Sequence, residues 1–570
     1  METLHDIGLQ QILTYVQPRI HEDIVHLVSR RFHRLMLRSV DLNLRFTVNM
    51  HPGMNYITSL ITSLESIRKI HMLNLSSELA TAHEANRVLA RFAFPILHQP
   101  PHNNNEVIFI PLKTLSLELC NAGELPVNTW NISTLQNLRI YKCLRITEIA
   151  AALDGLQNLT SLHVDKCRRL HVMPNLPPNL QTFTISSCPL VAMLPLNLDA
   201  VSSLRTLKFS KLAIRALPDI HLLTQLICLV LEHCVVLTTV GRVPGSIEEL
   251  SIENCVVLTE IEENNEFPNL RTLTLVSLPG LEHFDQWVQS LNLRVLNIDK
   301  CHKLRQPENL PTSLESLRVL ESRFSFTDCN MLCELRSLEL VKFLHNQWPC
   351  PDISQLTKLD SLILSGNQSL NVNLPTSIQK LSICYKTHDR FRGFPENILQ
   401  MRQITHLYLK NYALDDQSMT VLREMATACR AHNGTGWVVL SLWNCGLVSV
   451  PAWIGENTGL EKLDLTHNNI REFPVEFSNL VRLHSFSSGN DIYVHPQNGR
   501  HNPANRRPFP AFIYNLPRLQ TLELFTFFEH TRRNVHPVEI HLDRLTRLTH
   551  LNLSGNALRT VCNSSPYVPC

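Results

Sequence analysis

The chain has 570 residues, of which 18% are charged and 44% hydrophobic, and its formal net charge is +2. This near balance excludes an overall field that would recruit nucleic acid or an anionic membrane surface, and the composition does not favour long disorder. The start, METLHDIGLQQ, lacks the pattern of a signal peptide, and no run of about 18 apolar residues predicts a membrane span. We therefore expect a protein of the cytoplasm or nucleus that binds neither nucleic acid nor membrane.

Residues 1–50 carry apolar side chains at spacings of three and four, which is the period of amphipathic helices. The pattern is interrupted at Pro18, where a helix would lose a backbone donor. We predict a module of two or three short helices. Its apolar residues are Leu4, Leu9, Ile12, Leu13, Val16, Ile20, Ile24, Leu27, Val28, Phe32 and Leu35.

The first 45 residues resemble an F-box. The resemblance lies in the first apolar series, from Leu4 to Val16, and in DIVHLVSRRFHRL at 23–35. The chain departs from the family at His5, where a proline usually follows the leucine, and at Phe32, where tryptophan is most common.

This resemblance implies docking on a Skp-family adaptor, which links F-box proteins to a cullin–RING ubiquitin ligase. Such docking places exposed apolar side chains of short helices in a groove of the partner. The alternative is that the same side chains form the core of a helical cap. The adaptor-binding candidates are Leu9, Ile12, Leu13, Ile24 and Val28.

Residues 51–111 form a junction and an N-terminal cap. IRKIHMLNLS at 67–76 has the apolar set of a degenerate first repeat. The next segment, 78–97, has the pattern of a helix, and HQPPHNNNE at 98–106 has the composition of a loop. Such a cap would cover the exposed edge of the first full repeat.

From Leu112 to Leu553 the pattern L-x-x-L-x-L recurs nineteen times, at spacings of 19 to 36 residues. One such unit cannot bury its own apolar face, so the copies must stack. The sequence therefore predicts an α/β leucine-rich-repeat solenoid over 112–570, with a parallel sheet on the concave face. Returns such as LPTSL at 310–314 favour loops and short turns on the convex face.

Two repeats are longer than the others. One contains SMTVLREMATACRAH at 418–432, which we expect to be a helix. The other contains the insertion QNGRHNPANRRP at 497–508, which is either a functional loop or a tolerated surface insertion.

The cysteines follow the repeat. When the first leucine of a copy is position one, most of them fall on position nine, where asparagine stands in other copies. We expect this side chain to point inward and to satisfy backbone groups of the turn. Reduced thiols of an intracellular protein explain this register better than a disulfide framework does. The residues are Cys120, Cys143, Cys167, Cys188, Cys234, Cys255, Cys301 and Cys445, with Asn367, Asn468 and Asn556.

The repeat text resembles two further families. LPPNLQTFTISSCPLV at 175–190 and LPTSLESLRVLES at 310–322 are similar to repeats of plant nucleotide-binding disease-resistance receptors, but the chain has no G-x-x-x-x-G-K-[ST] motif. The L-P-x-x-L-x-x-L phrasing also resembles bacterial effector ubiquitin ligases. Those carry a catalytic-cysteine domain beside the repeats, for which the sequence leaves no room.

No combination of residues predicts catalysis. The chain has neither a G-x-S-x-G elbow nor an H-E-x-x-H pair. Cys329 and Cys333 lack partners at the spacing of a zinc site. We therefore expect no catalytic residue, cofactor or metal.

Positions three, five, seven and eight of each repeat should face outward from the sheet. Most carry Ser, Thr, Glu or Lys, but a late cluster joins charged and aromatic side chains, the types enriched in protein interfaces. The open alternative is that Trp443 only packs on its neighbours. The late cluster is His406, Tyr408, Lys410, Trp443, Lys462 and Asp464, with Lys380 and Phe525 beside it; an earlier cluster is Arg139, Tyr141, Lys142, His163, Asp165 and Lys166.

An F-box followed by leucine-rich repeats implies a substrate-recognition subunit of a cullin–RING (SCF-type) ubiquitin ligase. Its partners would be a Skp-family adaptor with its cullin complex and a protein substrate held on the concave face. The alternative is an intracellular leucine-rich-repeat scaffold or immune-type recognition protein without a ubiquitin link.

Overall fold

The structure, a computed structural model, describes residues 45–49, 72–77, 82–93, 96–97, 107–108 and 112–556. The last range has gaps at 121, 150–152, 154, 263–265, 284–291, 306–309, 323–330, 342–352, 366–372, 386–393, 396, 471, 490–508, 526–540, 542–543 and 555. The predicted adaptor-binding residues Leu9, Ile12, Leu13, Ile24 and Val28 lie outside the described residues, as do Asn367, Cys329 and the insertion 497–508.

The chain divides into two compact units. Unit 1 comprises Met1–Leu293 with Lys300–Asn309, and unit 2 comprises Arg294–Asp299 with Leu310–Cys570. Each of the nineteen predicted repeats contributes one strand, which confirms the predicted solenoid.

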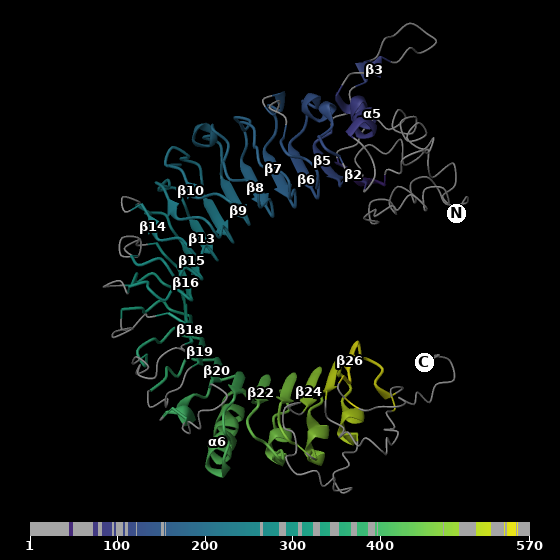
Figure 1. Cartoon of the computed structure of the whole chain (residues 1–570). Coiled ribbons are helices and arrows are strands. Elements are labelled where there is room, and N and C mark those ends of the chain that lie inside the picture. The colour runs from purple at the N-terminus through teal and green to yellow at the C-terminus, as the bar shows by residue number, and fades with distance from the viewer. Residues whose placement is uncertain are drawn as a thin grey trace, which may run out of the picture. The chain divides into compact units, whose positions relative to one another are not determined.

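In unit 1 each strand pairs in parallel with the next, and Figure 1 shows them side by side along one face. They are β1 (Arg45–Asn49), β2 (Met72–Ser77), β5 (Thr114–Leu119), β6 (Asn137–Tyr141), β7 (Ser161–Asp165), β8 (Thr182–Ser186), β9 (Thr206–Ser210), β11 (Cys228–Glu232), β13 (Glu249–Glu253) and β15 (Thr272–Val276).

The strands of unit 2 also pair in parallel, each with the next. Its strands are β16 (Val295–Asp299), β17 (Ser316–Leu320), β18 (Ser337–Val341), β19 (Ser361–Ser365), β20 (Lys380–Cys384), β21 (His406–Lys410), β22 (Val439–Trp443), β23 (Lys462–Thr466), β24 (Ser485–Gly489), β25 (Thr521–Phe525) and β26 (His550–Asn552).

The strands form because apolar and polar residues alternate, which suits an extended chain with one buried face. In β21, Leu407 and Leu409 are fully buried, whereas Tyr408 between them is half-buried on the outward face. The inward leucines of successive repeats form the core of each unit. We expected the outward face of the strands to be exposed to solvent throughout. It is not, because side chains of adjacent strands shield small outward side chains such as Cys228 and Val230 in β11.

Position eight of the repeat adopts a left-handed backbone conformation in twelve of the described repeats, none of which has glycine there. The φ angles lie between 42° and 60°. The residue turns the chain away from the strand while its N–H still bonds the next strand. The amide of Lys142 donates to Asp165 O at 2.9 Å, and that of Asn411 donates to Trp443 O at 2.9 Å. The regained hydrogen bond offsets the steric cost of the conformation.

Position nine points inward, as predicted. Of the eight cysteines there, seven are buried and Cys120 is half-buried. The thiol of Cys445 donates to Leu409 O at 3.4 Å and to Trp443 O at 3.5 Å. Burial raises the pKa of Cys445 to about 12, so this thiol stays protonated at neutral pH. All cysteines within the described residues are free thiols.

The returns opposite the strands are short, as expected. Unit 1 has a minor parallel sheet of β10 (Ala216–Leu217), β12 (Thr239–Val240) and β14 (Glu260–Ile261). Elsewhere the returns contain 3-10 turns, several of which begin after a proline whose missing N–H costs nothing there. These turns are η1 (Val127–Asn131), η3 (Leu198–Ala200), η4 (Ile398–Gln400), η5 (Ala452–Glu456), η6 (Val475–Asn479) and η8 (Ala511–Asn515).

The helix predicted at 418–432 is confirmed as α6 (Asp416–Asn433). The side chain of Asp415 caps its start by accepting the N–H of Ser418 at 2.9 Å. Gly434, at φ 79°, ends it in the left-handed conformation that glycine adopts without strain. Within the described residues, no helix has the length and apolar character needed to cross a membrane.

The junction differs from the prediction in two places. Residues 45–49, expected within the helical module, form β1 and pair with β2 of the degenerate repeat. The helix expected over 78–97 is limited to α5 (Ala82–Ala93), and β3 (Ile96–Leu97) pairs antiparallel with β4 (Val107–Ile108). Pro95 explains the early end, because proline disfavours helical backbone at the preceding residue. Asn86 of α5 bonds Asn128 of η1 at 2.8 and 2.9 Å, which holds the helix on the first repeat.

Candidate interaction surface

The structure brings the six residues of the predicted late cluster together on three adjacent strands of unit 2. β21 pairs with β22 and β22 with β23, so that Tyr408, Ser441 and Asp464 lie in one register across the sheet. Lys410 lies opposite Trp443 in the next register. We call this outward face of β20 to β26 the unit 2 strand face.

Four side chains form an aromatic row along the carboxyl ends of these strands. The ammonium of Lys410 lies 4.3 Å from the centre of the Trp443 ring. On the side of β23, the ring of His467 lies 4.4 Å from that of Trp443 and 5.8 Å from that of Phe525. Cation–π and ring contacts of this kind contribute roughly 0.5–1.5 kcal/mol each and fix the orientation of the rings. The tryptophan does pack on its neighbours, and the packing holds it half-buried on the outward face.

Gly489 makes the last contact of the aromatic row possible. It lies on β24, between β23, which His467 directly follows, and β25, which ends at Phe525, and it pairs with Phe525. A Cβ at this position would lie 2.8 Å from Cδ2 of the phenylalanine, which is closer than such atoms approach. The missing side chain therefore lets the ring lie across β24 towards His467.

Carboxylates occupy the middle of the unit 2 strand face. Asp464 accepts the hydroxyl of Ser441 at 2.9 Å and that of Thr466 at 2.8 Å. Further along, Glu523 accepts the hydroxyl of Ser487 at 2.9 Å. Each of these serine–carboxylate bonds joins neighbouring strands, so the carboxylates are held in fixed positions.

The amino ends of the strands carry basic groups. Lys380 of β20 lies opposite His406 of β21, and Lys462 occupies the same register on β23, two strands from β21. Burial and the nearby Lys380 lower the pKa of His406, which favours the neutral imidazole at neutral pH. Burial also raises the pKa of Tyr408, so its hydroxyl remains a donor. The unit 2 strand face thus has basic groups, carboxylates and aromatic rings in three parallel rows.

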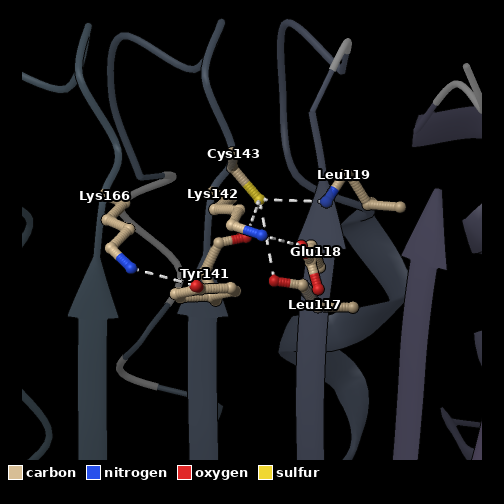
Figure 2. A network of polar contacts seen from close by, with 7 residues as sticks. All are labelled: Leu117, Glu118, Leu119, Tyr141, Lys142, Cys143 and Lys166. Atoms are coloured by element: carbon tan, nitrogen blue, oxygen red, sulfur yellow. Dashed lines mark hydrogen bonds and ion pairs between the residues drawn. The ribbon is translucent and has the colours of Figure 1, made fainter. Parts of the chain in front are cut away.

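The earlier cluster is also assembled, on the strand face of unit 1. Arg139 and Tyr141 lie outward on β6, and Lys142 and Lys166 follow β6 and β7 at position eight. Figure 2 shows the Lys166 ammonium at the Tyr141 hydroxyl and Lys142 turned towards Glu118 of β5.

Two residues that the aromatic row needs, His467 and Gly489, were not predicted from the sequence. His467 stands at position eight, and Gly489 directly follows a degenerate copy, LHSFSS, at 483–488. A rule that places position eight beside position seven of the preceding repeat would have found the contact of His467 with Trp443. Among the described residues, no group of three His, Cys, Asp or Glu side chains could hold a metal ion.

Comparison with known proteins supports the presence of leucine-rich repeats. The family model of the Leucine Rich Repeat matches residues 459–480, which contain β23. Protein SUPPRESSOR OF npr1-1, CONSTITUTIVE 1 of Arabidopsis thaliana is 29% identical over 328 residues, which is 56% of this chain and 19% of that protein. The chain therefore spans about a fifth of the length of this curated relative.

Solved structures of low sequence identity align along much of the chain. A leucine-rich-repeat protein of Leptospira interrogans is 18% identical, with 80% of this chain and 91% of that chain covered and a TM-score of 0.33. The Arabidopsis receptor kinase HAESA, in complex with the peptide hormone IDA and the co-receptor SERK1, is 16% identical, with 79% and 75% covered and a TM-score of 0.33. From the matched family model and the ladder of strands, the chain carries leucine-rich repeats and folds as a leucine-rich-repeat solenoid.

Proposed function

We propose that the chain is a protein-recognition scaffold that holds its partner on the unit 2 strand face. The observation that carries the proposal is the aromatic row, in which Trp443 is fixed between Lys410 and His467 on adjacent strands. Tryptophan, tyrosine and charged groups on a rigid surface are the side chains that dominate binding energy in protein interfaces. Because their positions are set before binding, little conformational entropy is lost when a partner docks.

The dimensions of the face favour a macromolecular partner. Six spacings of roughly 4.8 Å each separate β20 from β26, so the unit 2 strand face is roughly 29 Å across. The three rows offer a protein partner basic, acidic and aromatic contacts at once. We place this recognition in the cytoplasm or nucleus, where the buried free thiols at position nine would stay reduced.

We expect Tyr408→Ala combined with Trp443→Ala to abolish capture of the physiological partner, because the double change removes both large aromatic anchors from β21 and β22. Unit 2 should stay folded, with a loss of about 1–3 kcal/mol, because both side chains are only half-buried. The measurement is co-precipitation from the native source, with urea unfolding beside it.

The matched control is Arg423→Ala combined with Glu424→Ala, on the exposed side of α6, which should leave capture unchanged. If the double aromatic variant captures the partner as well as the wild type does, the unit 2 strand face is not the binding surface. An unfolded variant would show instead that the two rings belong to the core.

We further propose that this scaffold is the substrate-recognition subunit of a cullin–RING ubiquitin ligase. The support is the F-box resemblance of residues 1–45, ahead of the repeats. On this proposal the first helices dock on a Skp-family adaptor and the strand face presents the substrate. The chain itself would supply position and no chemistry.

Binding to a purified Skp-family adaptor tests this proposal. We expect the full-length chain to bind at micromolar concentration or below, and Leu13→Asp combined with Ile24→Asp to abolish binding, because charges would enter an apolar groove. Lys211→Asp, which reverses an exposed charge directly after β9 of unit 1, is the control. Failure of the wild-type chain to bind would favour the alternative, a recognition scaffold without a ubiquitin link.

A further inference from the structure

Three cations surround one phenol ring on the strand face of unit 1. The guanidinium carbon of Arg139 and the ammonium nitrogens of Lys142 and Lys166 lie 4.9, 4.9 and 5.0 Å from the centre of the Tyr141 ring. Any two of them are therefore at most about 10 Å apart, which is within one Debye length at 0.1 M salt. Salt therefore screens their mutual repulsion only in part, and the cluster attracts an anion.

Among the described residues, one of the three cations has a carboxylate partner. Lys142 pairs with Glu118 at 3.0 Å, and this bond holds the pKa of Lys142 above its ordinary value (Figure 2). Lys166 donates to the Tyr141 hydroxyl oxygen at 3.1 Å, which lowers the pKa of that phenol. Within the described part of the chain, Arg139 contacts the Tyr141 ring but has no hydrogen-bond acceptor. Arg139 and Lys166 therefore form no ion pair with any described carboxylate.

The other ionisable groups beside the cluster do not occupy it. Asp165, on β7 beside Tyr141, accepts the hydroxyl of Ser186 at 2.5 Å. Since β8 is on the far side of β7, this bond draws the carboxylate oxygen away from Tyr141. The Nε2 atom of His163 and the hydroxyl oxygen of Ser161 are hydrogen-bonded at 2.8 Å. Burial and the nearby Arg139 lower the pKa of His163.

We propose that Arg139, Tyr141 and Lys166 form a binding site for an oxyanion, a carboxylate or a phosphate, carried by an acidic peptide segment of a protein partner. The guanidinium and the ammonium supply charge-assisted hydrogen bonds, which are about twice as strong as neutral ones. The ring beneath them sets their positions, because each cation is already held against it. The site lies on unit 1 and does not depend on the recognition surface proposed for unit 2.

The same face limits the length of the acidic segment. Beyond β9, the outward positions of β11 and β13 carry Glu232, Glu249 and Glu253. β11 lies three strands from β7 and four from β6, which is roughly 14–19 Å at 4.8 Å per step. An extended acidic peptide of more than about six residues would reach these carboxylates at roughly 3.3 Å per residue. The site therefore favours a short acidic segment.

Binding of short labelled peptides to the full-length chain tests this inference. The probes are fluorescein-labelled peptides of alternating glutamate and glycine, of phosphoserine and glycine, and of lysine and glycine. We expect the first two to bind and the third not to bind, with affinity that falls as salt rises. Arg139→Ala and Lys166→Ala should each weaken binding about tenfold, Arg139→Lys should retain most of it, and the exposed control Arg215→Ala should have no effect.

The pKa of Tyr141 is a second measurement, and it would not change on addition of peptide if the cluster had only a structural role. A bound anion offsets the cations that depress the Tyr141 pKa, so saturating peptide should raise that pKa, seen as the absorbance difference from Tyr141→Phe. Wild-type affinity in folded Arg139→Ala and Lys166→Ala proteins would overturn the proposal. Displacement of the peptide by equal concentrations of inorganic phosphate, or tighter binding of a single-stranded oligonucleotide, would overturn the assignment to a peptide.

Discussion

Asn468→Ala should destabilise unit 2 by about 2–5 kcal/mol. Asn468 is 4% exposed, and its amide donates to Leu442 O at 2.6 Å and to Leu465 O at 3.0 Å. Its oxygen accepts the N–H groups of Cys445 at 2.9 Å and Leu447 at 3.1 Å. Alanine would leave two buried N–H groups without partners, and each unsatisfied group costs roughly 1–3 kcal/mol. The midpoint of urea unfolding at unchanged slope measures the loss.

Cys445→Ala is the matched comparison, because it empties position nine of the preceding repeat. The thiol is only a weak donor to two carbonyls, so we expect a loss of roughly 1–2 kcal/mol. If the two substitutions cost the same, position nine contributes by its volume and not by hydrogen bonding.

Trp437→Ala should cost unit 2 about 3–5 kcal/mol, the range for truncating a large buried aromatic side chain. The side chain is fully buried at position one of its repeat, and its ring meets that of Trp453 edge to face at 6.2 Å. Both rings belong to the repeat that starts at Trp437, and because each repeat stacks on its neighbours, the loss should lower the cooperativity of unfolding as well as its midpoint. The measurement is urea unfolding followed by far-ultraviolet circular dichroism.

Trp437→Phe should recover about half of that loss, because a smaller ring still fills much of the space. In the wild-type chain, Trp443→Ala should lower the free energy of unfolding by less than half as much as Trp437→Ala, because Trp443 is only half-buried. Equal losses at the two tryptophans would place Trp443 in the core and remove it from the interaction surface.

The solenoid could be predicted from the sequence because its information is repeated. The period sets the stacking, and the alternation in each L-x-x-L-x-L copy sets which side chains point inward. Position nine could be assigned in the same way, since small polar residues recur there in one register. The helix α6 was predictable because its apolar spacing and its capping residues, Asp415 and Gly434, agree with each other.

Features that depend on contacts between repeats were harder to predict. The left-handed conformation at position eight could not be predicted from a glycine, because none of these residues is glycine. The hydrogen bond to the next strand determines the conformation instead. β1 was missed because RFTVN at 45–49 lacks the leucines of the repeat, and only its pairing with β2 makes it a strand. The aromatic row needs Gly489 and His467 from separate repeats, and no single copy contains that arrangement.

Site-specific photo-crosslinking tests most directly whether the unit 2 strand face recognises a protein. Benzoylphenylalanine in place of Tyr408 or Lys462 would report the strand face, and the same residue in place of the exposed Arg423 of α6 would report the opposite side of that unit (Figure 1). We predict that the two strand positions crosslink the same protein in cells and that the α6 position does not. Crosslinks from α6 with none from the strand positions would contradict the proposal.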